Sequence, residues 1–145
     1  MLYLEYEDYK RRCKVTQDKL VEILNEKEAL FAMTQIKAVD YGKDRVSGGN
    51  GANVFETYMI EKERARIDER LQEARSLLND RQTLLAAKER ELRESTHVED
   101  KIYLYRKVER RRVYWIAKRL NYSQSQVYRI LQRIDENLKM RENAS

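Results

Sequence analysis

The chain has 145 residues, of which 38% are charged, and it contains no proline and only four glycines. A chain this rich in charged helix formers and this poor in helix breakers is expected to be all-α, with long helices and no large globular core. One cysteine and one histidine exclude an internal disulfide and a cysteine-based metal site, and no apolar stretch is long enough to span a membrane. We therefore expect a cytoplasmic protein.

The net charge of +5 is unevenly distributed along the chain. Residues 101–145 hold 12 Lys and Arg against 4 Asp and Glu, whereas residues 1–100 hold 18 against 21. The basic excess is thus confined to the last third of the sequence. A basic segment beside a near-neutral one is typical of a nucleic-acid-binding module.

The first predicted helix covers residues 2–38. Apolar and small residues recur in it at three- and four-residue steps, which places them on one face of a helix. That face consists of Tyr6, Tyr9, Cys13, Thr16, Leu20, Ile23 or Leu24, Leu30 and Thr34. Residues 16–19 lack a strong apolar anchor, so this segment is a candidate break or second helix start.

A predicted loop follows at residues 40–53, which contain all four glycines together with several Asn and Asp. This composition disfavours both helix and strand. We interpret the segment as a connector between two antiparallel helices. The alternative is a phosphate-binding loop, but the Gly-Gly-Asn-Gly spacing matches neither nucleotide-binding fingerprint, and no Lys-Ser or Lys-Thr pair follows it.

The second long helix is predicted over residues 54–95, where apolar residues alternate at three- and four-residue spacing with a few charged members. This heptad seam consists of Ile60, Arg64, Ile67, Leu71, Ala74, Leu78, Arg81, Leu85, Lys88 and Leu92. A long helix with so narrow a seam needs a partner helix in water. The partner is either the first helix, folded back as a coiled-coil-like antiparallel hairpin, or another subunit.

A domain boundary is predicted between residues 95 and 96, which makes 1–95 a helical hairpin and 96–145 a second domain. Ser95 or Thr96 can cap a new helix, and Glu99 stands three residues after Thr96, as in a capping box. His97 lies at this helix start, and we assign it no chemistry.

Three short helices are predicted in residues 96–145. The first is marked by Ile102, Tyr105 and Val108, and Arg110, Arg111 and Arg112 form a basic corner after it. The second carries Val113, Ile116, Ala117 and Leu120. Residues 121–122 form a turn, after which the third helix carries Val127, Ile130, Leu131, Ile134 and Leu138.

The turn before the third helix has the sequence features of a helix-turn-helix. Ser123 is a good N-cap with Gln126 three residues later, and Tyr122 and Val127 stand where a hydrophobic staple requires them. Asn121 occupies the turn position where glycine is common, and asparagine tolerates the left-handed conformation. The short turn forces the two helices to cross sharply, and Ala117 supplies the small residue at the crossing.

The exposed side of the third helix carries the residue types that read DNA. Arginine pairs bidentately with guanine and glutamine with adenine in the major groove, so we expect base-edge contacts from Gln124, Ser125, Arg129 and Arg133. Gln132 lies on the same side. Phosphate and other backbone contacts are expected from Ser123, Tyr128, Arg111, Arg112, Lys118 and Arg119. The alternative is an ordinary solvated face, and Tyr103, Tyr105, Tyr114 and Trp115 are expected to fill the small core.

Residues 100–131 resemble the fourth region of bacterial sigma factors, and the run Ile-Ala-Lys-Arg-Leu-Asn-Tyr-Ser at 116–123 is the most specific part of that resemblance. The overall layout is similar to phage and prophage transcription regulators of the ArpU and RinA type. The resemblance implies a location in a bacterial cell or phage-infected host, action on late phage genes, and contact with RNA polymerase. The chain has no clear counterpart of the sigma region that binds the −10 element, so a regulator fits better than a complete sigma factor.

These features predict a sequence-specific double-stranded DNA-binding transcription regulator, with a homo-oligomer forming through the long helices. The alternative is a phage terminase small subunit that recognises a packaging site, and a third hypothesis is a coiled-coil adaptor that binds only protein. An enzyme is not expected, because the sequence shows no nucleophile–base pair, no paired carboxylates in an apolar setting and no metal-ligand spacing. We expect no metal and no cofactor.

Overall fold

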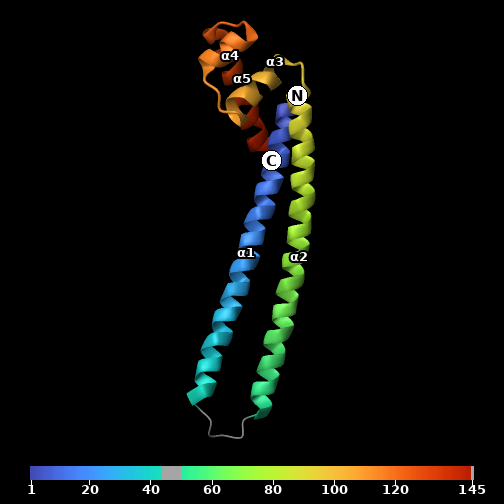
Figure 1. The fold of residues 1–145 in the computed structure, drawn as a ribbon, viewed down its shortest axis with the longest axis vertical. Coiled ribbons are helices and arrows are strands. Elements are labelled where there is room, and N and C mark those ends of the chain that lie inside the picture. Colours follow the sequence, from blue (N-terminus) through green and yellow to red (C-terminus); the bar gives the residue numbers. More distant parts are fainter. Residues whose placement is uncertain (44–49, 145) are drawn as a thin grey trace. The chain divides into compact units, whose positions relative to one another are not determined.

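The computed structural model describes residues 1–43 and 50–144, with side chains described outside residues 34–53. Within these residues the chain is helical and contains no strand, as predicted for the all-α class (Figure 1). No helix of the described residues is both long enough and apolar enough to cross a membrane. The elements in chain order are α1 (Leu2–Lys43), α2 (Asn50–Glu94), α3 (Val98–Tyr103), the π-helical turn η1 (Leu104–Val108), α4 (Val113–Leu120) and α5 (Gln124–Ala144).

The two long helices extend further than the sequence predicted. α1 continues to Lys43 and α2 begins at Asn50, so the predicted loop at residues 40–53 was too long at both ends. The rest of that loop, residues 44–49, lies outside the described residues. α1 also runs without a break through residues 16–19. A single glycine costs a helix only about 1 kcal/mol, which a long helix tolerates.

The chain divides into two compact units. Unit 1 contains Met1–Arg12 together with Arg81–Ser145, and unit 2 contains Cys13–Asp80. This division differs from the predicted boundary at residues 95 and 96, because it groups the start of α1 and the end of α2 with the three C-terminal helices.

Unit 2 is formed by α1 and α2 packed along the predicted seam. Its buried cluster consists of Ile23, Ile67, Leu71 and Ala74. Ion pairs join the helices at Lys27–Asp68 (2.8 Å) and Arg70–Glu26 (2.7 Å). From Glu26 to Lys27 the residue number on α1 rises, whereas the paired residue on α2 changes from Arg70 back to Asp68. The two segments therefore run antiparallel. Of the predicted seam residues in this unit, Arg64 is exposed.

Unit 1 contains the larger core, to which every one of its elements contributes. Tyr3 and Tyr103 are fully buried, and their rings stack with centroids 5.4 Å apart. Burial raises the pKa of the Tyr103 phenol, whose hydroxyl donates a hydrogen bond to Glu7. The other buried residues of this cluster are Tyr6, Leu92, Ile102, Leu104, Val113, Ile116, Ala117, Val127, Leu131 and Ile134.

The buried carboxylate of Asp100 ties α3 to the start of α1. It accepts a hydrogen bond from the backbone N–H of Tyr3 (3.1 Å) and another from the hydroxyl of Ser95 (2.8 Å). One of the N–H groups that α1 leaves without a helical partner is thereby satisfied. The predicted capping box at Thr96 and Glu99 was wrong: α3 begins after His97, which makes no side-chain cap hydrogen bond.

Candidate nucleic-acid interface

The turn between α4 and α5 has the geometry that the sequence predicted. Asn121 is left-handed, with φ 59° and ψ 41°. The N–H of Tyr122 donates to the carbonyl of Ala117 (2.9 Å) and the N–H of Asn121 to that of Lys118 (3.4 Å). These bonds satisfy carbonyls that the last turn of α4 leaves open, so the chain leaves α4 in one fixed direction.

The start of α5 is fixed by a reciprocal capping box. The N–H of Gln126 donates to Oγ of Ser123 (3.2 Å), and the N–H of Ser123 donates to Oε1 of Gln126 (3.0 Å). Tyr122 and Val127, the two predicted staple residues, both belong to the core cluster of unit 1. The predicted capping box is therefore present, and the two staple residues lie in the same apolar cluster.

The buried residues of α4 and α5 decide which face of α5 meets solvent. Val127, Leu131 and Ile134 of α5 are buried together with Ile116 and Ala117 of α4. Because α5 buries residues at spacings of four and three, its opposite face is exposed. All seven polar residues that the sequence placed on this side are exposed, namely Ser123, Gln124, Ser125, Tyr128, Arg129, Gln132 and Arg133.

Arg129 and Arg133 differ in what holds their guanidinium groups. In the described part of the chain, Arg129 forms no ion pair and no side-chain hydrogen bond. Arg133 donates to the carboxylate of Glu99 on α3 (3.1 Å). The second oxygen of Glu99, Oε2, is buried and has no hydrogen-bond partner among the described residues. Sequence reasoning missed Glu99 as a neighbour because it lies 34 residues away and follows no periodic pattern with Arg133.

The basic corner between η1 and α4 holds Arg111 in a defined place. The chain turns at Arg110, which has a positive φ of 56°. The N–H of Arg111 donates to the carbonyl of Tyr105 (2.8 Å), and its guanidinium lies 4.6 Å from the centre of the Trp115 ring. Glu109 also pairs with Arg111 (3.7 Å). The backbone hydrogen bond, the Trp115 ring and the Glu109 carboxylate therefore position Arg111, while its side chain stays exposed.

The other predicted phosphate-binding residues are also exposed. Arg112 is the N-cap of α4, and both Arg112 and Arg119 lack an ion pair in the part of the chain that the structure describes. The ammonium of Lys118 lies 4.7 Å from the ring centre of Tyr114. Since Tyr114 is 56% exposed, the prediction that it fills the core was wrong.

The other three aromatic residues of this segment lie in or against the core. Tyr103 is fully buried, as predicted. Tyr105 and Trp115 are half-buried and meet edge to face, with ring centroids 5.2 Å apart. Of this pair, the Trp115 ring is the one over which the Arg111 guanidinium lies.

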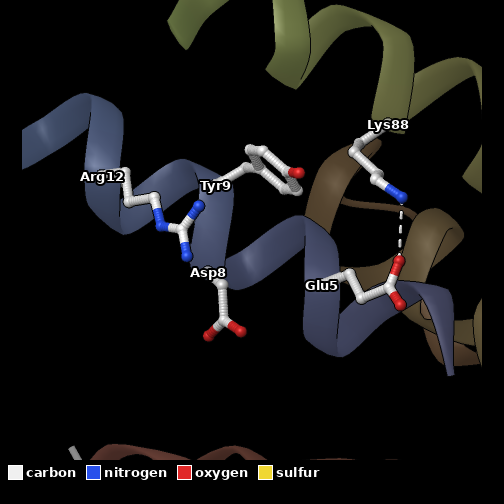
Figure 2. A pocket seen from close by; sticks show the side chains of 5 residues that line it. All are labelled: Glu5, Asp8, Tyr9, Arg12 and Lys88. Atoms are coloured by element: carbon white, nitrogen blue, oxygen red, sulfur yellow. Dashed lines mark hydrogen bonds and ion pairs between the residues drawn. The ribbon is translucent and has the colours of Figure 1, made fainter.

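A small surface pocket in unit 1, of about 260 Å³, is lined by Glu5, Asp8, Tyr9, Arg12 and Lys88 (Figure 2). Lys88 donates to Glu5 (2.9 Å), and this hydrogen bond lowers the pKa of the carboxyl and raises that of the ammonium. Acidic and basic side chains are balanced here, so the pocket offers little net charge to a ligand. Among the described residues, no group of three His, Cys, Asp or Glu could hold a metal ion.

Comparison of the chain with models of protein families, with curated proteins and with solved structures found no match. The residues and their geometry therefore carry the functional argument.

Proposed function

We propose that the protein is a sequence-specific double-stranded DNA-binding transcription regulator in which α4, the turn and α5 act as a helix-turn-helix. In this proposal α5 lies in the major groove and α4 crosses behind it. The left-handed Asn121 and the Ser123–Gln126 capping box support it, because they fix the crossing of the two helices before DNA is bound.

The observation that carries the proposal is the chemistry of the exposed face of α5. Gln124, Ser125 and Arg129 are exposed to solvent, whereas the apolar side of the same helix is buried in the core. Guanidinium and amide groups make the bidentate contacts that distinguish guanine and adenine. No acidic residue precedes Asp135 on this helix, so nothing on its first turns repels the DNA backbone.

The two arginines of α5 are not equivalent in this proposal. Arg129 is the principal base-reading residue, because its guanidinium has no competing partner in the described structure. Arg133 must first leave Glu99, and that contact reduces the net gain from a base contact.

Arg111, Arg112, Lys118 and Arg119 would contact phosphates and thereby supply affinity without sequence information. The N-terminus of α5, with Ser123 and its exposed hydroxyl, would add a further phosphate contact. These basic residues come from the corner before α4 and from its last turn, so they would contact the backbone on either side of α5.

The biological setting is proposed from the sequence resemblance to sigma region 4 and to ArpU- and RinA-type regulators. It comprises a phage or prophage origin, control of late genes and contact with RNA polymerase. The alternative of a terminase small subunit uses the same DNA-binding surface on a packaging site.

The test is retention of random genomic fragments by the purified protein across a salt series, followed by sequencing. Enrichment of a promoter-like site supports the proposal, and enrichment within a packaging gene supports the terminase alternative. Retention with a steep salt dependence but no enriched sequence contradicts specific recognition. Absence of binding at low salt contradicts DNA binding altogether and favours a protein adaptor.

A further inference from the structure

The corner between η1 and α4 holds an arginine in a strained backbone conformation. Arg110 has a φ of 56°, in the left-handed region, where the Cβ of a residue lies too close to the following carbonyl oxygen. Asn121 is the other non-glycine residue with a positive φ in the described part of the chain, and asparagine tolerates this region. Arginine lacks that tolerance, so what it offers at this position over glycine or asparagine is its charged side chain.

Hydrogen bonds around Arg110 keep the corner in this conformation. The N–H of Arg111 donates to the carbonyl of Tyr105 (2.8 Å), and the guanidinium of Arg106 donates to the carbonyl of Arg111 (3.0 Å). The turn η1 before the corner is π-helical, a form that occurs often at functional sites. Strained residues persist only where the surrounding structure holds them, and they cluster at sites that bind ligands.

The side chain of Arg110 is exposed and carries an uncompensated charge. It forms no ion pair and no hydrogen bond with any residue that the structure describes. Glu109 is the only acidic residue in the sequence from 101 to 134, and its carboxylate pairs with Arg93 (3.0 Å) and Arg111 (3.7 Å). Because other arginines neutralise this carboxylate, the guanidinium of Arg110 is free to bind an anion from outside the chain.

We propose that Arg110 binds a phosphate of duplex DNA, and that the strained corner fixes the backbone from which its side chain reaches that phosphate. This inference rests on the helix-turn-helix proposed above, whose first helix, α4, would cross the DNA backbone. Arg110 lies three residues before the start of α4 at Val113. A guanidinium matches the geometry of a phosphate and forms two parallel hydrogen bonds with it. A fixed corner lowers the cost of ordering this contact when DNA binds.

A phosphate contact affects binding differently from a base contact. It releases counterions from a duplex of any sequence, so Arg110 would raise the affinity for all sequences alike. Near 0.1 M salt, one such contact raises the affinity about five- to tenfold, and it steepens the logarithmic dependence of affinity on salt by about one unit.

The test measures the affinity of the full-length protein for an enriched fragment and for an unrelated duplex across a salt series. Arg110→Gly should weaken binding to both duplexes about five- to tenfold near 0.1 M salt and lower the salt slope by about 1. Arg110→Lys keeps the charge but not the planar fork, so it should keep the salt slope and only part of the affinity. Lys139→Ala, at an exposed lysine of α5, is the control for the loss of one positive charge and should change binding little.

The glycine variant also separates binding from folding. Glycine adopts a φ of 56° without a Cβ penalty, so the midpoint of urea unfolding should be at least as high as that of the wild type. Weaker binding by a variant of undiminished stability does not come from loss of the fold. Should Arg110→Gly be less stable, Arg110→Asn is compared with Arg110→Lys at matched stability, and the salt slope should fall only in the asparagine variant.

Three outcomes overturn the proposal, and they differ in what they leave standing. If the wild type binds DNA and Arg110→Gly loses no more affinity than Lys139→Ala, with an unchanged salt slope, Arg110 makes no phosphate contact and the helix-turn-helix stands. A loss confined to the enriched fragment would make Arg110 a base-reading residue instead. Absence of duplex binding by the wild type at low salt would overturn the proposed function and this inference together.

Discussion

Units 1 and 2 use the same two long helices in different ways. In unit 1, the start of α1 and the end of α2 supply Tyr3, Tyr6 and Leu92 to a core shared with α3, α4 and α5. Among the residues whose side chains are described, those of unit 2 meet through a small apolar cluster and exposed ion pairs. The comparison teaches that the proposed DNA-binding face belongs to the unit with the larger described cluster, whose core depends on residues from both ends of the sequence.

The largest effect should come from removing a side chain that joins the N-terminus to this core. Tyr3→Ala deletes a fully buried ring that stacks on Tyr103 and accepts a hydrogen bond from Asn137 (2.9 Å). We expect the free energy of unfolding to fall by about 3–5 kcal/mol, as measured by urea denaturation. Tyr128→Ala is the control, because that ring is 58% exposed. A loss at Tyr3 no larger than the control's would show that the N-terminus is not part of the core.

A second substitution contrasts a buried carboxylate of unit 1 with an exposed one of unit 2. Asp100→Ala leaves the N–H of Tyr3 and the hydroxyl of Ser95 without their acceptor, and we expect a loss of about 2 kcal/mol. Asp68→Ala removes the ion pair with Lys27, in which the side chains of Lys27 and Asp68 are 39% and 49% exposed, and should change stability far less. Equal losses in thermal or urea unfolding would contradict the difference between the units.

A smaller effect is expected at the capping box that begins α5. Ser123→Ala removes the acceptor for the N–H of Gln126 and should cost about 1 kcal/mol. Ser125→Ala, two residues further along the helix, is the matched control and should be nearly neutral. The comparison is made by urea denaturation without DNA, so that a role in DNA binding does not enter. An unchanged stability for Ser123→Ala would show that the hydrogen bond is dispensable.

The smallest effect concerns the exposed pair of Glu5 and Lys88. The hydrogen bond from Lys88 holds the pKa of Glu5 below its ordinary value of 4.5, so the folded state favours the ionised carboxylate. The pair therefore stabilises the fold above about pH 4.5 and loses its contribution as the pH falls through the lowered pKa. Melting temperatures of the wild type and Glu5→Gln should differ slightly near pH 7 and converge in acid. A difference that grows in acid would contradict this sign.

The sequence predicted local features well where neighbouring residues determine them. The left-handed Asn121 and the Ser123–Gln126 box follow from turn and capping preferences alone. The buried seam of α2 follows from its periodicity, because residues such as Ile67, Leu71 and Ala74 alternate at four- and three-residue steps.

What the sequence did not predict depends on contacts between distant residues. The burial of Tyr3 requires the start of the chain to meet its C-terminal helices, and no periodic pattern records that. The pairing of Arg133 with Glu99 joins residues 34 positions apart, which no periodic pattern records either. Ser95 bonds to Asp100 instead of capping α3, because a buried carboxylate competes for its hydroxyl. For the candidate site, the sequence predicted which residues of α5 are exposed. It did not predict that Arg133 pairs with Glu99.

The central claim is that α5 reads DNA bases, and Arg129 tests it most directly. Affinities of the wild type and Arg129→Ala are measured on an enriched fragment and on an unrelated duplex across a salt series, with Lys139→Ala as a control for loss of one positive charge on the same helix. We predict that Arg129→Ala weakens binding to the enriched fragment by about tenfold or more and to the unrelated duplex by a small factor, as a lost base contact requires. Equal losses on both duplexes, or a loss no larger than that of Lys139→Ala, would contradict the claim.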